Sequence, residues 1–220
     1  MLRKNLIKIF LIIALICVSI NPIKASIIEE NEARLWVNNT GHKLIDALSS
    51  SDIQAKYQTL DTMFTEDVDT EYMARFVIGK YWKTMSQEEQ NTFLDLFNRY
   101  AKSIYKNYPL NFDTKGLDFE VTSIKQNQKF TDVNCIVTLP EQFATETLKN
   151  INIKFKLTKT NNKIKIIDLT FAESGLLTTY RTRFYTMISN LDGEISWFLE
   201  DFNDMVISSE KTAEEKAQYY

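Results

Sequence analysis

The sequence predicts an α+β protein in which helices pack on one face of a curved, four-stranded antiparallel sheet and enclose an apolar cavity. Three observations carry this prediction. Apolar residues recur at helical spacing over residues 29–108, alternate with polar ones over 117–171, and return to helical spacing until about 208. A block of strands between two blocks of helices is typical of α+β proteins. A sheet with one apolar face can then curve around a pocket under the helices.

The first helical block contains two strong apolar stripes. They are formed by Tyr72, Met73, Phe76 and Val77, and by Phe93, Phe97, Tyr100 and Ile104. Residues three and four apart lie on one face of a helix, so each stripe predicts a helix with one buried side. Ser86 and Glu89 have the spacing of a capping box, which predicts the start of the second of these helices.

The middle block alternates with a period of two. Its two clearest runs of alternate apolar residues are Leu117, Phe119, Val121 and then Ile151, Ile153, Phe155, Leu157. This alternation predicts strands with one buried and one wet face. Residues 126–129 and 159–162 are short connections that favour hairpins and antiparallel pairing. In the last strand the apolar positions shift parity after Ile166, which predicts a bulge there.

The last block begins where residues 168–171 leave the sheet and enter a helix through Glu173, Ser174 and Gly175. We expect a break at residues 190–193, followed by one more stripe of Ile195, Phe198, Leu199, Phe202, Met205 and Val206. With three prolines and five glycines leaving little room for linkers, we expect one domain over residues 26–208. Residues 209–220 form a polar tail that we expect to be disordered.

The N-terminus has the order of a cleavable secretory signal peptide, which we assign to residues 1–25. Basic residues precede an apolar run over residues 9–20, which is shorter than the roughly 20 residues of a membrane-spanning helix. Cleavage removes four basic residues and no acidic one, so the net charge of −3 becomes −7. We therefore expect no binding to nucleic acid, whose phosphates require a basic surface.

The residues of common catalytic and metal sites are missing or isolated. His42 is the single histidine, so neither a nucleophilic side chain nor a zinc ion has an obvious set of partners. Cys135 lies in an alternating strand, where a buried, inert thiol is expected. The sequence contains no glycine-rich phosphate loop. We therefore expect no enzyme activity, no metal and no cofactor.

Two stretches, residues 72–108 and 168–188, resemble the MlaC family, the periplasmic phospholipid-binding proteins also labelled toluene-tolerance proteins. The resemblance spans about residues 30–206. It rests on a helix that ends in a small cluster of Gly, an aromatic residue, Trp and a basic residue, on the helix that follows, and on a Tyr-Arg-x-x-Phe pattern after the last strand. The matching residues are Gly79, Tyr81, Trp82, Lys83, then Phe93 and Phe97, then Tyr180, Arg181 and Phe184.

The resemblance implies a nuclear transport factor 2-like arrangement and a soluble periplasmic phospholipid carrier. Such a carrier would shuttle lipid between an inner-membrane ABC transporter complex and an outer-membrane lipoprotein complex, and so maintain the lipid asymmetry of the outer membrane. The physics fits this role, because roughly 30 acyl methylenes at about 0.8 kcal/mol each would cost on the order of 25 kcal/mol to expose to water.

We expect the acyl chains to lie between the apolar sheet face and the helix stripes. The expected lipid-binding residues are Phe76, Phe93, Phe97, Tyr100, Phe119, Val121, Phe155, Leu169, Phe171, Leu177, Tyr180, Arg181 and Phe184. For Arg181 two roles stay open, one at the cavity rim and one in holding the preceding turn. Arg183 projects from the other flank of the same helix and is expected to be solvated.

Two other classes of protein are compatible with the sequence. One is an exported small-molecule-binding protein or enzyme on a cone-shaped α+β fold, acting on an apolar substrate, for which Asp168 is the best candidate carboxylate. On strand parity Asp168 faces away from Ile167 and Leu169, which favours a turn or surface role. The other class is an adaptor that binds proteins and no lipid, whose core would be closed at ordinary packing density.

Overall fold

The computed structural model describes residues 27–107, 112–171 and 173–218. The predicted signal peptide, residues 1–25, lies outside the described residues. Within them, no helix is both long and apolar enough to cross a membrane. In chain order the elements are α2 Glu30–Ser49, α3 Ile53–Asp67, α4 Thr70–Ile78, the 3-10 helix η1 Gly79–Lys83, α5 Gln87–Lys106, β1 Asp118–Gln126, β2 Thr131–Thr138, β3 Asn150–Thr160, β4 Lys163–Phe171, β5 Ser174–Gly175, α6 Leu176–Asn190 and α7 Ile195–Gln218.

The strands form one antiparallel sheet in the order β1-β2-β3-β4-β5, which confirms the predicted α+β class and antiparallel pairing. The sheet has five strands where four were predicted. The additional strand, β5, is only Ser174–Gly175 and pairs with Thr170 and Phe171 as the chain turns back toward α6. Two residues are too few to produce an alternating pattern, so this strand left no signal in the sequence.

Hairpin geometry follows the local residue types. The β3–β4 turn places Asn161 and Asn162 at φ of 51° and 61°, the left-handed region that Asn tolerates better than most residues. The predicted bulge is confirmed in β4, where the register skips Ile167 between the partners of Lys156 and Leu157. This bulge explains why both Ile166 and Ile167 are buried although they are neighbours in one strand.

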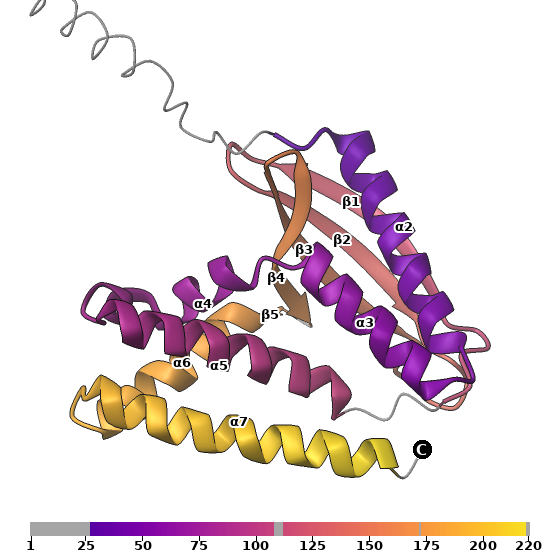
Figure 1. The fold of residues 1–220 in the computed structure, drawn as a ribbon. Coiled ribbons are helices and arrows are strands. Elements are labelled where there is room, and N and C mark those ends of the chain that lie inside the picture. The colour runs from indigo at the N-terminus through magenta and orange to yellow at the C-terminus, as the bar shows by residue number, and fades with distance from the viewer. Residues whose placement is uncertain (1–26, 108–111, 172, 219–220) are drawn as a thin grey trace, which may run out of the picture.

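Helices α2 and α3 form a hairpin that lies against one side of the sheet (Figure 1). The Arg34 guanidinium donates to the carbonyl of Val121 at 3.0 Å, which ties α2 to β1. A Cβ at Gly41 would lie 2.6 Å from the Phe119 ring, so the glycine lets α2 approach the sheet closely. At the other end of the hairpin, the backbone N–H of Asp69 donates to the carbonyl of Ile166 at 2.9 Å.

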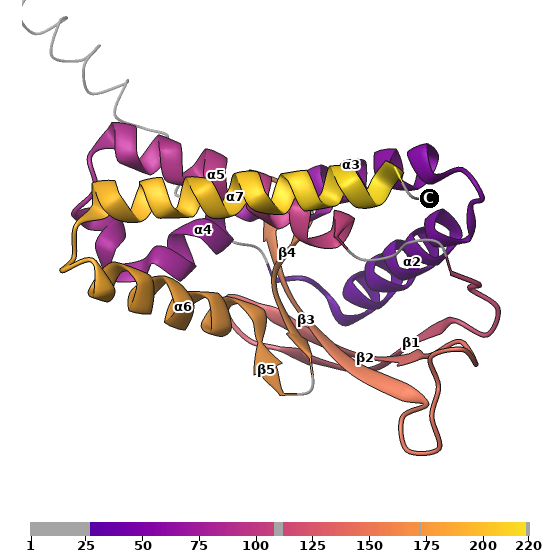
Figure 2. The same cartoon turned by 90° about the horizontal axis from the view of Figure 1, so that it is seen from below.

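The remaining helices, α4 to α7, form a second layer beside the sheet (Figure 2). Ser86 and Glu89 make the predicted capping box at the start of α5. The stripe of α5 packs mainly on α6 and α7, where five phenylalanines with neighbouring ring centroids 5.0–6.1 Å apart form an aromatic cluster. These are Phe93, Phe97, Phe184, Phe198 and Phe202.

Helix α7 continues to Gln218, where the sequence predicts a disordered tail from residue 209. Three contacts explain the difference. Arg99 makes a bidentate pair with Glu210 at 2.9 and 2.7 Å, Ala213 is buried, and the Lys216 ammonium donates to the carbonyl of Asn107 at 2.6 Å. The polar composition of residues 209–220 suggested disorder. The groups that fix the last turns of α7 belong to α5 and to the residue after it, about 110 positions earlier in the chain, so a local pattern could not reveal them.

Candidate functional site

An apolar cavity of about 410 Å³ lies between the α2–α3 hairpin and the sheet. The two helices contribute one wall and alternate residues of the strands contribute the other. The helix wall includes Trp36, Leu44, Leu48, Leu60, Met63 and Phe64, and the sheet wall includes Leu117, Phe119, Val137, Ile153, Phe155 and Leu169. We call this hollow the apolar cavity.

Strand register places the sheet wall on one face. Phe119 stands opposite Val137, and Phe155 stands opposite Leu169. Residues directly opposite in an antiparallel pair point to the same side, so the alternate apolar residues of four strands converge. The Phe119 and Phe155 rings meet edge to face at 6.2 Å.

The volume of the apolar cavity sets how much hydrocarbon it holds. An apolar cavity of about 150 Å³ holds one benzene, which corresponds to roughly 25 Å³ per carbon. On that scale 410 Å³ accommodates roughly 16 carbons, about one acyl chain of common length. An apolar void of this size is large for a core at ordinary packing density, which favours a ligand-binding pocket over a closed adaptor core.

Few ionisable groups reach the apolar cavity. In the described part of the chain these are Asp67 and Tyr105. Burial raises the pKa of the Asp67 carboxyl above its ordinary value, Glu66 adds to this effect, and Lys43 and Lys165 oppose it. Burial and the neighbouring Asp61 carboxylate raise the pKa of Tyr105, so its hydroxyl stays protonated as a donor to Asp61. The wall therefore offers hydrocarbon contact with little charge.

Three of the residues expected from the sequence to bind lipid, Phe119, Phe155 and Leu169, line the apolar cavity. The others do not line it. Val121 is buried in the core cluster and Phe171 is 43% exposed at the end of β4. Most of the rest lie in or against the aromatic core between α5, α6 and α7, and these are Phe93, Phe97, Tyr100, Leu177, Tyr180 and Phe184.

The sequence led us to pair the stripes of α5 and α6 with the sheet face. In the structure those stripes meet Phe198 and Phe202 of α7 instead, because α7 supplies a third apolar face of matching length. The sheet face is covered by α2 and α3, whose contributions were missed. A signal existed, because Leu60, Met63 and Phe64 have the i, i+3, i+4 spacing of a helical stripe. Trp36, Leu44 and Leu48 are spaced by eight and four residues, which also keeps them near one face of a helix.

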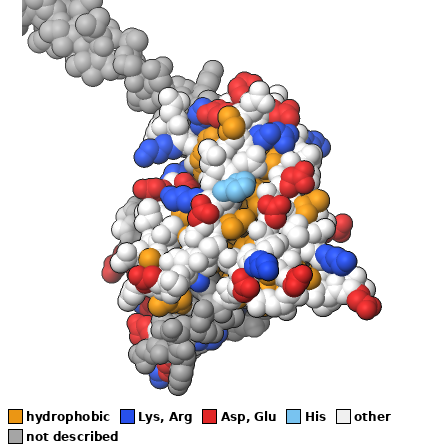
Figure 3. All heavy atoms as spheres, turned by 90° about the vertical axis from the view of Figure 1, so that its right-hand side faces the viewer, with side chains coloured by type: hydrophobic (Ala, Val, Ile, Leu, Met, Phe, Trp, Pro, Cys, Tyr) orange, Lys and Arg blue, Asp and Glu red, His pale blue; other side chains and the backbone are white. Residues whose placement is uncertain are grey.

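Helix α2 also leaves apolar side chains at the surface. Leu35 is 63% exposed and Leu44, which reaches the cavity wall, is 37% exposed. Figure 3 shows hydrophobic side chains among the charged ones on this side of the molecule, around the histidine.

Arg181 does not line the apolar cavity, and its hydrogen bond is made to α4 and not to the turn that precedes α6. Its Nε donates to the carbonyl of Phe76 at 2.9 Å, and its guanidinium lies 4.0 Å from the Phe76 ring centroid. The residue thus holds the C-terminal end of α4 and Phe76 beneath it. Gly79 follows with φ of 51°, and a Cβ there would lie 2.2 Å from the Tyr185 hydroxyl, so glycine is required at this junction.

Arg183 is exposed, as expected of a solvated flank, but it also makes contacts. Its guanidinium donates to the Tyr100 hydroxyl at 3.2 Å and to the Met205 sulfur at 2.9 Å. These contacts join α6 to α5 and α7. The long side chain reaches across the helix surface, which helical-wheel position alone does not reveal.

Asp168, the candidate carboxylate of the enzyme alternative, has a structural partner. Its Oδ1 accepts from the backbone N–H of Leu177 at 3.2 Å, in the first turn of α6, and from that of Leu169 at 2.8 Å. It therefore satisfies an otherwise unpaired donor at a helix start. Asp168 does not line the apolar cavity.

The other candidate reactive groups are isolated. His42 Nδ1 lies 2.7 Å from the carbonyl of Asn38, on α2 itself. Burial raises the pKa of the Cys135 thiol to about 12, which keeps it protonated and unreactive. Among the described residues, no three His, Cys, Asp or Glu side chains gather as a metal site would require.

Fold and cavity together define an α+β protein with an apolar pocket between a helical hairpin and a sheet. Residues 38–197 match the family described as MlaC protein, so the chain belongs to the MlaC family, as the sequence predicted. A comparison with curated proteins gives no match. Among solved structures, the chain resembles a phospholipid-binding protein from Ralstonia solanacearum in complex with a phospholipid. The TM-score is 0.64 and the identity 16%, over 80% of this chain and 98% of that chain, so the likeness is one of fold.

Proposed function

We propose that the protein is a soluble periplasmic phospholipid carrier, and that the acyl chains of the bound lipid occupy the apolar cavity. The observation that carries the proposal is an apolar void of about 410 Å³ walled by the α2–α3 hairpin and the sheet. Membership of the MlaC family supports it, and so does the fold shared with a protein described in complex with a phospholipid. The acyl chains would contact Phe119, Phe155 and Leu169 on the sheet wall.

We further propose that the carrier shuttles lipid between an inner-membrane ABC transporter complex and an outer-membrane lipoprotein complex, and thereby maintains outer-membrane lipid asymmetry. The support is the family resemblance together with the physical need for shielding. Two exposed acyl chains cost on the order of 25 kcal/mol in water, which prevents unassisted passage between membranes. In this role the protein binds and transports lipid and performs no reaction.

The test is the lipid content of the protein. The chain from residue 26 onward is purified, its lipids are extracted and identified by mass spectrometry, and the lipid-free protein is then incubated with phospholipid vesicles. About one phospholipid per protein is expected after separation from the vesicles. If the purified protein carries no phospholipid and acquires none from vesicles, the proposal is wrong.

A matched pair of variants on α3 ties the binding to the apolar cavity. Leu60→Asp places a carboxylate in the cavity wall, where an unpaired charge is strongly unfavourable, and should abolish lipid uptake. Thr65→Asp adds the same group at an exposed position on the same helix and should bind lipid as the unmodified protein does. Circular dichroism confirms that both variants are folded. Equal uptake by the two would place the lipid elsewhere.

A further inference from the structure

The face of the sheet that points away from the α2–α3 hairpin carries a hollow of about 360 Å³, which we call the outer hollow. Ile153 of β3 contributes to both linings, because its strand is part of the wall between the outer hollow and the apolar cavity. The sheet therefore separates the two hollows. The outer hollow is lined by Thr122, Asn134, Cys135, Asn152, Ile153, Lys154, Thr170 and Glu173.

Strand register brings polar side chains of the outer hollow into one row. Asn134 of β2 and Thr170 of β4 stand directly opposite Lys154 of β3, one on each side of it. Thr122 is the extra residue of the bulge in β1, and its hydroxyl donates to the carbonyl of Asn134 at 3.0 Å. Neighbouring strands are about 4.8 Å apart, so these side chains can contact one small molecule together.

Lys154 lies in the middle of this row and lacks a counter-charge. It is half-buried, and in the described part of the chain its ammonium makes no ion pair or hydrogen bond. Lys156, on the same face of β3, provides the contrast, because Asp132 and Asp168 stand directly opposite it. The neighbours of Lys154 are instead an amide and a hydroxyl, which are neutral and can themselves donate to an anion. A half-buried ammonium in such surroundings gains from an anion brought to it.

Asn152 and Glu173 add an amide and a carboxylate to the lining, groups that donate to and accept from ligand hydroxyls. Neither side chain makes a hydrogen bond or an ion pair within residues 27–107, 112–171 and 173–218. Glu173 takes a φ of 72°, which is uncommon for glutamate, and residues held in such conformations cluster at functional sites. A void of about 150 Å³ holds one six-membered ring, so about 360 Å³ accommodates roughly two.

We propose that the outer hollow binds an anionic sugar, that is, a hydroxyl-rich ring that carries one carboxylate or phosphate. The anionic group would pair with the Lys154 ammonium. Asn134, Asn152 and Thr170 would contact the ring hydroxyls, and Glu173 would accept from one of them. The inference does not rest on the proposed function, because the outer hollow and the apolar cavity share no polar residue.

The experiment titrates the isotope-labelled chain from residue 26 onward and follows its amide chemical shifts by NMR. The probes are glucuronate and glucose 6-phosphate as anionic sugars, glucose as a neutral sugar, and inorganic phosphate as an anion without a ring. Both anionic sugars should shift the amides around Lys154. They should bind about tenfold or more tightly than glucose or phosphate, because each of these lacks one part of the contacts.

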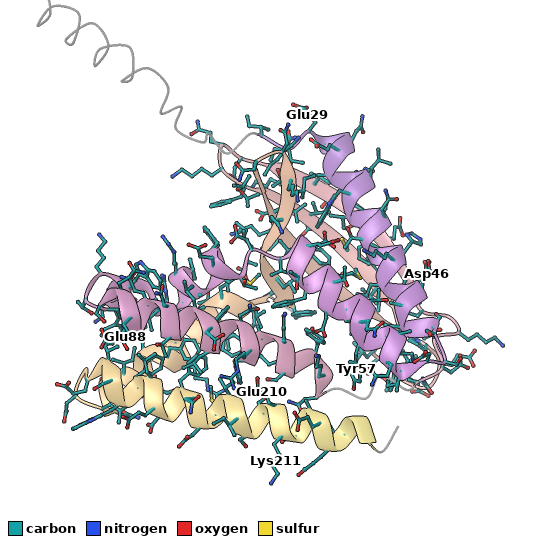
Figure 4. The ribbon with its side chains drawn as sticks, viewed as in Figure 1. Glu29, Asp46, Tyr57, Glu88, Glu210 and Lys211 are labelled. Atoms are coloured by element: carbon teal, nitrogen blue, oxygen red, sulfur yellow. The ribbon has the colours of Figure 1, made fainter. Side chains whose placement is uncertain are left out.

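Matched variants tie the binding to the outer hollow. Asn152→Asp places a carboxylate in the lining near Lys154 and should weaken the binding of both anionic sugars about tenfold or more. Asn150→Asp makes the same change at the exposed start of β3, outside the lining, and should leave binding unchanged. Lys154→Gln should also weaken binding about tenfold. Lys211→Gln removes the same charge from α7 in the helical layer (Figure 4) and should have no effect.

Three results would overturn the inference. If neither anionic sugar binds saturably, the outer hollow is only a wet sheet face. If inorganic phosphate binds as tightly as glucose 6-phosphate, Lys154 is an anion site without sugar recognition. If Asn150→Asp or Lys211→Gln weakens binding as much as the variants of the lining, the effect comes from net charge. Lipid uptake by the same variants should be unchanged, so sugar binding and the proposed carrier function can fail separately.

Discussion

Removing the Tyr105 hydroxyl should loosen α3 while leaving the helical layer unchanged. Helix α3 buries only Lys56 and Met63, so little apolar contact holds it over the apolar cavity. Its polar contacts with α5 include those of Asp61, which accepts from the Tyr105 hydroxyl and pairs with Lys106. Tyr105→Phe deletes the hydroxyl and keeps the ring that packs on Phe64.

The magnitude follows from the chemistry of this bond. A hydrogen bond to a charged group contributes about 1.5–3 kcal/mol, and the lower half of that range applies because Asp61 is 38% exposed and keeps Lys106. A loss of about 1.5–2 kcal/mol raises the open population of α3 roughly 10- to 30-fold. The loss acts on local opening, because the aromatic core of α5, α6 and α7 does not involve this bond.

Amide hydrogen exchange measures this directly. Exchange in residues 57–67 should accelerate about 10- to 30-fold in Tyr105→Phe, while α5–α7 amides in the aromatic core keep their rates. Tyr185→Phe is the matched control, since it loses a hydroxyl that accepts from the Lys80 backbone N–H at 3.0 Å in the helical layer. If α3 exchanges no faster in Tyr105→Phe, or if every helix accelerates equally, α3 is not a separately opening unit.

Three further predictions concern single side chains. Gly41→Ala should push α2 from the sheet and destabilise the protein by about 1–3 kcal/mol in urea unfolding, and adding Phe119→Leu should recover part of the loss. Arg181→Ala should lower stability by about 2–3 kcal/mol, because the Phe76 carbonyl loses a charged donor, while lipid bound per folded molecule stays unchanged. Cys135 should resist iodoacetamide at pH 8 until the protein unfolds. Since its folded pKa of about 12 exceeds the ordinary 9.0, its contribution to stability should be full below pH 9 and decline as pH rises toward 12.

Periodicity located the four long strands and the helices from α4 onward, because both periods are local properties of the chain, whereas the stripes of α2 and α3 were missed. The capping box at Ser86 and the bulge beside Ile166 were visible for the same reason. Pairing between elements was less visible, since a stripe of aromatics on α5 is equally compatible with a sheet face or with another helix. In the structure the stripe of α5 packs on the aromatic stripe of α7, so Phe93 and Phe184 lie in the core and not in the cavity wall.

The composition of the two layers suggests why the missed residues are the ones that line the cavity. A rigid core favours large rings that lock together, and the α5–α7 layer holds most of the buried phenylalanines. The α2–α3 wall consists mostly of Leu, Ile, Val and Met with fewer rings, so it contains no aromatic stripe. The cavity is thus lined by helices whose apolar stripes are less aromatic than those of α5, α6 and α7.

Cavity volume links these observations to transport. A phospholipid carries roughly 30 acyl carbons beyond its headgroup, whereas about 410 Å³ accommodates roughly 16, so the described cavity holds about half of the hydrocarbon. The walls of the sheet and helical layer are fixed by register and by interlocked rings, which leaves the α2–α3 hairpin as the part able to move outward. The Asp61 contact with Tyr105 and Lys106 is the polar restraint on that movement that comes from the helical layer, in addition to the hydrogen bonds that tie the hairpin to the sheet. Tyr105→Phe should therefore speed both lipid uptake from vesicles and lipid release to them. The amount of lipid bound at equilibrium should change little, because opening of the hairpin speeds both directions.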